Sequence, residues 1–258
     1  GQDRGRMVRK PRHIPSIPAP SPTILMMLEA SADDLPGGIR VLDRRERAEE
    51  RSRNALISNA QELARGLMAC GVRNGDRVAI ILPTCHGFLD AFFGTQWAGA
   101  IPAALYPPVR LGRLDEYVSK TVRMLQSLQV EMLITDSRCS KLLGQVVRES
   151  GVSITTVEEL KNNSKPAQLY KPTPDDVAFI QFSSGSTRDP APAVLTHAHV
   201  MANVEAICHE LPDEALEGGG GCVGWLPLYH DMGLLGCMLT TIRCQRELTL
   251  IPPELFLV

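Results

Sequence analysis

The chain has 258 residues, and 44% of them are hydrophobic, which is enough for a sizeable core in one large domain or two small ones. Its 27 basic and 29 acidic side chains give a net charge of −2, which argues against a nucleic-acid-binding surface. No apolar run reaches the length of a membrane span, so we expect a soluble protein.

The chain contains seven cysteines, an odd number, scattered without a C-x-x-C pair. This spacing favours neither a disulfide framework nor a zinc site. Most of them lie in apolar contexts and are interpreted as small core residues. Cysteines of this kind fit a reducing, cytoplasmic setting. They are Cys70, Cys85, Cys139, Cys208, Cys222, Cys237 and Cys244.

The chain opens with a basic segment, GQDRGRMVRKPRH, followed by prolines at 15, 18, 20 and 22. No apolar segment follows the charges, so it is not a secretory signal. An RNA-binding arm or an organelle address would also be basic, but a solvated tail is the simpler interpretation. Repeated proline prevents helix formation. We expect residues 1–22 to be disordered and residues 23–258 to form the folded domain.

Helical and strand patterns alternate from residue 23 onward. Helices are predicted over 23–32, 86–98, 115–128 and 137–150, and strands over 39–42, 78–82, 101–105, 132–135 and 152–155. The charged run 43–53 merges into a helix that ends at Gly71, and its charges are interpreted as the solvated face of that helix. This alternation predicts a parallel sheet covered by helices.

The pattern continues in the second half of the chain after an exposed loop at 162–174. Strands are predicted over 178–182, 222–226 and 247–251, and helices over 197–209, with Thr196 as N-cap, and over 231–241. The loop 211–221 ends in four consecutive glycines, and we expect it to be disordered.

A turn rich in hydroxyls and glycine follows the apolar run that ends at Phe182. It reads Ser183, Ser184, Gly185, Ser186, Thr187, and its hydroxyls and unhindered backbone N–H groups could cradle a phosphate. The same composition also connects strands that bind no ligand. It is not a Walker P-loop, because no Lys-Ser or Lys-Thr pair follows Gly185 at the required spacing.

A second unusual segment, GWLPLYHDMGLLG, runs from Gly224 to Gly236. Together with SSGST and the later Thr196-His197 pair, it resembles the adenylate-forming superfamily, and most of all its fatty acyl-AMP ligases. The likeness extends upstream through Gly75 to Val78, residues 88–102 and Tyr106-Pro107-Pro108. It implies an α/β fold: a partial N-terminal domain of the acyl-CoA synthetase and luciferase type, with mostly parallel sheets covered by helices.

The resemblance implies activation of a long-chain fatty acid by ATP, with Mg²⁺, to give an acyl-adenylate. Transfer to the phosphopantetheine thiol of an acyl carrier protein would follow, in lipid or polyketide assembly, with coenzyme A as the alternative acceptor. The phosphate-gripping residues would be Ser183, Ser184, Gly185, Ser186, Thr187 and Arg188.

The resemblance also assigns His230 and Asp231 to a position beside the acyl and adenylate pocket, with His230 as the catalytic candidate. Trp225, Met232 and Gly233 would bind the substrate. Two alternatives stay open: a histidine that only hydrogen-bonds to Asp231, and apolar residues that only pack. His197 and His199 form an H-x-H pair without a third ligand at a convincing spacing, so His197 is interpreted as structural and no metal ligand is assigned.

Two departures from the family pattern weigh against catalysis by this chain alone. Pro192 replaces a glycine after the phosphate loop, and because proline fixes φ and lacks an N–H, we expect it to deform the loop. The chain also stops before the family's adenine-binding motifs and the catalytic lysine of its C-terminal domain, so we expect an inactive fragment. The competing hypothesis is a non-catalytic module that binds nucleotide, lipid or a partner.

Overall fold

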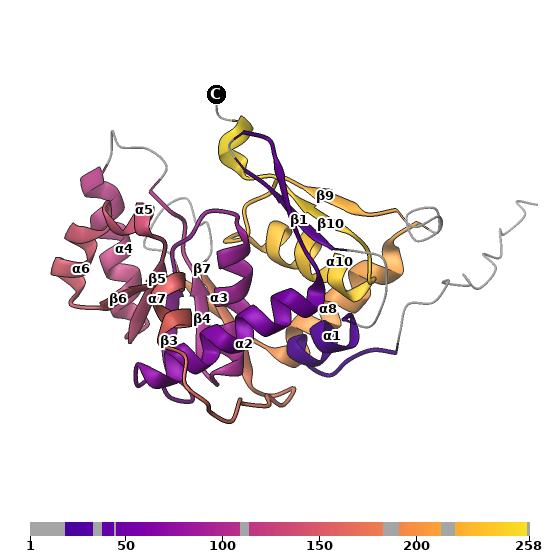
Figure 1. Ribbon diagram of the computed structural model, residues 1–258, viewed down its shortest axis with the longest axis horizontal. Helices are drawn as coiled ribbons and strands as arrows, with labels where there is room; N and C mark the ends of the chain where they lie inside the picture. The colour runs from indigo at the N-terminus through magenta and orange to yellow at the C-terminus, as the bar shows by residue number, and fades with distance from the viewer. Residues whose placement is uncertain are drawn as a thin grey trace, which may run out of the picture.

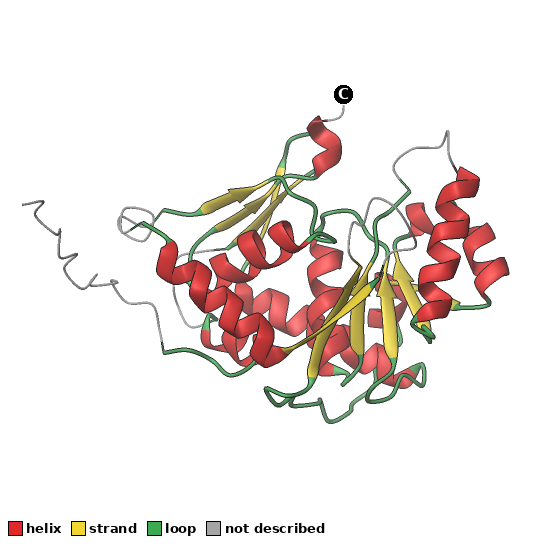
Figure 2. Ribbon diagram, turned by 180° about the vertical axis from the view of Figure 1, so that it is seen from behind, coloured by secondary structure: helices red, strands yellow, loops and turns green. Residues whose placement is uncertain are grey.

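Two β-sheets with helices around and between them make up the computed structural model, which describes residues 19–32, 38–43, 45–108, 114–182, 191–212 and 220–256. Figure 2 shows the sheets as two separate groups of strands with helices between them. This arrangement confirms the predicted α/β class with mostly parallel sheets.

The larger sheet has the strand order β6-β5-β3-β4-β7-β8. The first five of these strands are parallel, whereas β8 pairs antiparallel with β7 and forms one edge. Its strands are β3 (Arg77–Ile80), β4 (Ile101–Ala104), β5 (Met132–Thr135), β6 (Ser153–Thr156), β7 (Val177–Phe182) and β8 (Pro192–Thr196). Parallel pairing brings the carboxyl ends of β3, β4, β5 and β7 to a single edge of this sheet.

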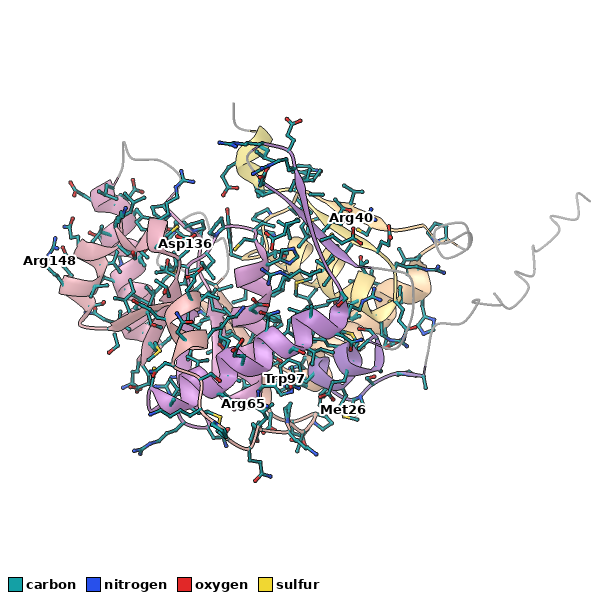
Figure 3. The ribbon with its side chains drawn as sticks, viewed as in Figure 1. Met26, Arg40, Arg65, Trp97, Asp136 and Arg148 are labelled. Atoms are coloured by element: carbon teal, nitrogen blue, oxygen red, sulfur yellow. The ribbon has the colours of Figure 1, made fainter. Side chains whose placement is uncertain are left out.

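Helices cover both faces of the larger sheet, because alternate residues of a strand point to opposite faces. Val78 and Ile80 of β3 belong to a core with α2 (Arg53–Ala69), α3 (His86–Trp97) and α7 (Val157–Asn162). Ala79 and Ile81 belong to a second core with α4 (Leu114–Ser127) and α6 (Gly144–Ser150). Figure 3 places Arg148 of α6 at the outer edge of the molecule, where its side chain is exposed.

The smaller sheet has the order β2-β1-β10-β9. It combines the N-terminal strands β1 (Ile39–Leu42) and β2 (Ala48–Arg51) with the C-terminal strands β9 (Cys222–Gly224) and β10 (Leu248–Leu250). A π-helix, η2 (Met232–Leu239), and α10 (Thr240–Arg243) connect β9 with β10, and the short helix η3 (Pro253–Phe256) follows. The helices α1 (Ile24–Ala30) and α8 (His197–Glu210) pack between the two sheets, against α10.

Several predicted elements differ from those observed. Part of the charged run 43–53 was expected to extend a helix, but residues 48–51 form β2, whose backbone pairs with β1 while three of its four side chains are exposed. The single helix predicted over 137–150 is two helices, α5 (Ser137–Ser140) and α6, because the buried Leu143 leaves the helical conformation (φ −90°, ψ 1°). Most of the helix predicted over 231–241 is π-helical, and neither α7 nor β8 was predicted.

The predicted disorder of residues 1–22 and 211–221 stays a prediction, since 1–18 and 213–219 lie outside the described residues. The first observed helix begins at Ile24, with the Thr23 hydroxyl accepting a hydrogen bond from the backbone of Met26. Every helix among the described residues is too short or too polar to cross a lipid bilayer.

Candidate functional site

The phosphate-loop candidates follow β7 at the carboxyl edge of the larger sheet. Ser183, Ser184, Gly185, Ser186, Thr187 and Arg188 lie outside the described residues. The strands before and after them are described, and Phe182 at the end of β7 lies opposite Pro192 at the start of β8. The carboxyl ends of parallel strands are where ligands bind in open α/β sheets, and β7 ends at that edge.

Pro192 is accommodated at the beginning of strand β8. Its side chain is exposed, and β8 lies at the edge of the sheet. The first residue of an edge strand is a position that tolerates a missing N–H. β8 therefore pairs with β7 even though it begins with a proline. The expected deformation concerns residues 183–190, which lie outside the described part of the chain.

The segment between β9 and η2, residues 225–231, lies against the carboxyl ends of β7 and β4. The Gln181 side chain at the end of β7 donates a hydrogen bond to the Tyr229 carbonyl, at 3.4 Å. The Tyr229 ring lies 6.5 Å, centroid to centroid, from the ring of Tyr106, which follows β4. These contacts bring the second sequence motif next to the strand that leads into the first.

His230 and Asp231 lie together at the start of η2. The His230 Nδ1 is 2.5 Å from the Asp231 Oδ1, and the backbone N–H of Met232 donates to Asp231 Oδ1 at 2.8 Å. Both side chains are exposed, so each is accessible to a ligand. The arrangement holds the imidazole by one nitrogen and leaves its Nε2 available for a hydrogen bond to a carboxylate or a phosphate.

Gly233 is buried and has a structural role. A Cβ added there would lie 2.3 Å from the Pro227 carbonyl oxygen and 2.8 Å from that of Leu226. Only glycine lets η2 approach the backbone of the preceding segment this closely. Gly233 therefore positions the motif and offers no side chain to a substrate. The π-helical form of η2 is of a kind often found at functional sites.

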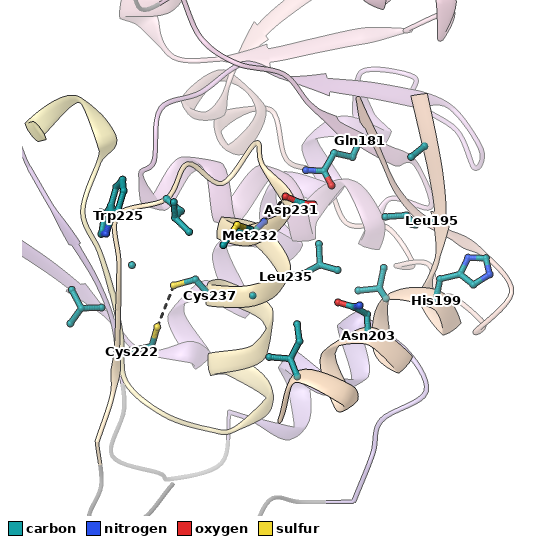
Figure 4. A pocket seen from close by; sticks show the side chains of 17 residues that line it. Gln181, Leu195, His199, Asn203, Cys222, Trp225, Asp231, Met232, Leu235 and Cys237 are labelled. Carbon is teal, nitrogen blue, oxygen red and sulfur yellow. Dashed lines mark hydrogen bonds between the residues drawn. The ribbon is translucent and has the colours of Figure 1, made fainter. Parts of the chain in front are cut away.

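A cavity of about 760 Å³ lies between the β8–α8 and β9–η2 parts of the structure. Its wall is mainly apolar, and the predicted substrate-binding residues Trp225, Asp231 and Met232 contribute to it (Figure 4). Its polar side chains are few, as in most sites for small apolar ligands. The lining residues are Gln181, Ala193, Leu195, His199, Val200, Asn203, Ile207, Cys222, Val223, Gly224, Trp225, Leu226, Asp231, Met232, Leu235, Gly236 and Cys237.

Sequence reasoning missed the part of this wall that α8 supplies. His199, Asn203 and Ile207 line the cavity from that helix, and Figure 4 shows His199 and Asn203 on the side opposite Trp225. Their four-residue spacing places them on one helix face, so this spacing was an available signal. This spacing does not indicate which elements pack against that face of α8, because β9 and η2 come from a later part of the chain.

His197, in contrast, is part of the core. Its side chain is 1% exposed, and its Nδ1 accepts a hydrogen bond from the backbone N–H of Ile24 at 3.2 Å. Burial lowers the pKa of His197 to about 4, partly opposed by the carboxylate of Asp176. It is therefore neutral and structural at pH 7. No group of three or more metal-binding side chains occurs in the described part of the chain.

The sequence matches a family model described as AMP-binding enzyme over residues 28–257. A putative acyl-CoA synthetase from Caulobacter vibrioides is 34% identical over 201 residues. The long-chain-fatty-acid–AMP ligase FadD26 of Mycobacterium tuberculosis is 33% identical over 207 residues. Each alignment covers 78% of this chain and 35% of the relative, so the chain spans about a third of the length of these relatives.

Solved structures give the same assignment. A structure from work on fatty acyl-adenylate ligases of E. coli and L. pneumophila superposes with a TM-score of 0.84 at 32% identity, covering 93% of this chain and 43% of that one. The McyG A-PCP structure with phenylalanyl-adenylate has a TM-score of 0.82 at 22% identity, over 91% of this chain and 37% of that one, and shows the common fold alone. The chain therefore belongs to the AMP-binding enzyme family, and it is similar to the fatty acyl-AMP ligases within that family.

Proposed function

We propose that this chain supplies the acyl cavity and the phosphate loop of a ligase that activates a long-chain fatty acid with ATP. The observation that carries the proposal is the apolar cavity of about 760 Å³, whose wall includes Asp231, the neighbour of His230, and Gln181 at the carboxyl end of β7. An acyl chain lying in this cavity can direct its carboxylate toward that end of the strand. The names of the relatives FadD26 and the fatty acyl-adenylate ligases support this substrate class.

In the proposed reaction a carboxylate oxygen of the fatty acid attacks the α-phosphorus of ATP. A phosphorus–oxygen bond forms, the bond to the pyrophosphate oxygen breaks, and acyl-adenylate and pyrophosphate result. Reactions of this kind need positioned donors more than covalent help. We assign the donors to Ser183, Ser184, Gly185, Ser186, Thr187 and Arg188. His230 would hydrogen-bond to the reacting carboxylate or phosphate, held in place by Asp231.

The resemblance implies Mg²⁺ as well, which would offset the negative charge of the phosphates. Asp231 is already engaged with His230 and with the backbone of Met232, and we assign no metal ligand among the described residues. We also propose a cytoplasmic location, since all seven cysteines are free thiols, which fits a reducing compartment.

The acceptor of the acyl group is a further proposal. We favour the phosphopantetheine thiol of an acyl carrier protein, because FadD26 is named as an AMP ligase. Coenzyme A is the second candidate, and the name of the Caulobacter relative, a putative acyl-CoA synthetase, favours it. Supplying each thiol to the preformed acyl-adenylate and identifying the thioester by mass spectrometry distinguishes the two.

The test is ATP–pyrophosphate exchange that depends on fatty acid, measured on this chain and on the longest natural reading frame that contains it. We expect exchange in the longer protein and none in the 258-residue chain. In the longer protein His230→Ala should lower the exchange rate by about 10²-fold, as loss of a positioned donor does. His209→Ala, which alters an exposed histidine of α8, is the matched control. A folded longer protein without exchange on any fatty acid would refute the proposal.

A further inference from the structure

Two cysteines face each other in the wall of the cavity. Cys222 lies on β9 and Cys237 on η2, and their Sγ atoms are 3.4 Å apart (Figure 4). Both residues line the cavity, and a small molecule that enters it can reach Cys222, which is half-buried, whereas Cys237 is only 6% exposed. The proposed adenylation chemistry makes no use of either thiol.

The packing of β9 on η2 brings these sulfur atoms into contact. Gly224, two residues after Cys222, has no room for a side chain, because a Cβ there would lie 2.2 Å from the Cys237 Sγ. The missing side chain lets Cys237 lie directly against the strand. The sulfur atoms need to approach each other by only a little more than 1 Å to reach the disulfide bond length of about 2 Å.

The two thiols are chemically unequal. A hydrogen bond from Cys237 lowers the pKa of Cys222, and the hydroxyl of Thr241 lowers it further, against the opposing effect of burial. The same pairing, together with burial, raises the pKa of Cys237. These directions favour Cys222 as the nucleophile of the pair, and Cys222 is also the more exposed of the two, since Cys237 is buried.

We propose that Cys222 and Cys237 are a site of reversible oxidation, at which a hydroperoxide converts the thiol pair into a disulfide. The Cys222 thiolate attacks one peroxide oxygen, the oxygen–oxygen bond breaks, and Cys222 becomes a sulfenic acid as water leaves, or an alcohol from an organic hydroperoxide. Cys237 then attacks that sulfur, losing its proton, and the sulfenic oxygen departs as a second water. Two thiols are oxidised and one hydroperoxide is reduced.

The position of the pair gives the disulfide a local consequence. Cys222 and Cys237 enclose the segment that contains Trp225, His230 and Asp231. A bond between them closes this segment into a covalent ring and fixes β9 to η2 at the cavity wall. Oxidation therefore constrains the backbone at the cavity wall without chemically changing Trp225, His230 or Asp231. Formation of the bond itself does not depend on the proposed ligase function.

A second pair supplies the control. Cys208 of α8 and Cys244, directly after α10, have their Sγ atoms 3.3 Å apart, but they are only 2% and 7% exposed and do not line the cavity. The distance between the sulfur atoms is thus matched, and Cys237, at 6% exposed, is as buried as Cys244. The pairs differ because Cys222 is only half-buried and lies at the cavity. If contact alone decided oxidation, the two pairs would react alike.

The test treats the folded chain with hydrogen peroxide, blocks free thiols with N-ethylmaleimide and identifies linked peptides by mass spectrometry. We expect the Cys222–Cys237 peptide at a peroxide concentration at least about tenfold lower than the Cys208–Cys244 peptide, because accessible thiolates oxidise first. Dithiothreitol should remove it. Linkage of both pairs at the same concentration, or no Cys222–Cys237 link while circular dichroism shows a folded chain, would overturn the proposal.

The two single variants test the order of the steps. In Cys237→Ser the sulfenic acid on Cys222 has no thiol to resolve it, so dimedone should label Cys222. In Cys222→Ser dimedone should leave Cys237 unlabelled at the same peroxide concentration. Labelling of Cys237 in place of Cys222 would contradict the assigned roles. The peptide analysis of the unmodified chain decides the main proposal even where a variant fails to fold.

Discussion

Lowering the pH should destabilise this protein through His197. The ring is buried, accepts a hydrogen bond from the Ile24 N–H through Nδ1, and has a pKa of about 4 in the folded chain against an ordinary value of 6.5. Between these two values the unfolded chain binds a proton that the folded chain does not. The stabilisation is therefore present above pH 6.5 and is lost as the pH falls toward 4.

The size of the effect follows from the two pKa values. The full difference corresponds to about 3 kcal/mol, and about 2 kcal/mol of it is lost between pH 7 and pH 5. Urea unfolding followed by circular dichroism at both pH values measures the free energy of unfolding. His197→Asn is the informative variant, because its side-chain oxygen can accept the Ile24 hydrogen bond but does not titrate.

The prediction concerns the difference between the chain and its variant. His197→Asn should reduce the loss of stability between pH 7 and pH 5 by about 2 kcal/mol. Burial also lowers the pKa of His86, so this residue adds to the pH dependence of stability. Its contribution is the same in the chain and in His197→Asn and cancels in the comparison. His199→Asn is the control, since solvent reaches this ring in the folded chain. Equal pH dependence in the chain and in His197→Asn would refute the reasoning.

Three further substitutions test other parts of the structure. Asp90 is 1% exposed and its Oδ2 accepts hydrogen bonds from Arg51 and Lys161. Asp90→Ala should destabilise the fold by about 3 kcal/mol in urea unfolding, because both cations lose their buried carboxylate and keep only Glu49 and Asn59. Asp43→Asn, at the exposed ion pair of Asp43 with Arg47, should leave the unfolding midpoint nearly unchanged. Equal destabilisation by Asp43→Asn and Asp90→Ala would contradict the larger stabilisation expected from the buried carboxylate. Gly233→Ala places a Cβ against the Pro227 carbonyl oxygen and should lower the free energy of unfolding by about 2 kcal/mol in urea. An unfolding midpoint equal to that of the unmodified chain would show that residues 226–227 can move away from the added Cβ. Gly236 faces open space in the cavity, so Gly236→Leu should raise the KM of the proposed ligase for long-chain acids by about tenfold and affect short acids less, with Gly236→Ala as control. An equal rise in KM for acids of every chain length would contradict the placement of the acyl chain in the cavity.

Local sequence patterns predicted the parallel sheet well. The strand 132–135 and the helix starting at His86 were predicted at the observed residues, because a buried strand reads as a short apolar run and a helix buried on nearly every side, as α3 is, reads as a longer one. β2 was missed, since its sequence, AEER, is polar and only its backbone pairing with β1 makes it a strand. β8 was missed for a related reason: three of its five residues are exposed at the sheet edge.

The sequence by itself determined the family, through the SSGST and GWLPLYHDMGLLG motifs, and with it the expectation that His230 and Asp231 belong to a site. Only the tertiary structure decided what surrounds them. The α8 face with His199 and Asn203, the close approach of Gly233 to Pro227 and the contact of Cys222 with Cys237 all depend on how later elements pack on earlier ones. A local pattern specifies which face of a helix or strand is apolar. Which other element covers that face depends on contacts between residues far apart in the sequence, and the hydrophobic periodicity of a single segment carries no information about them.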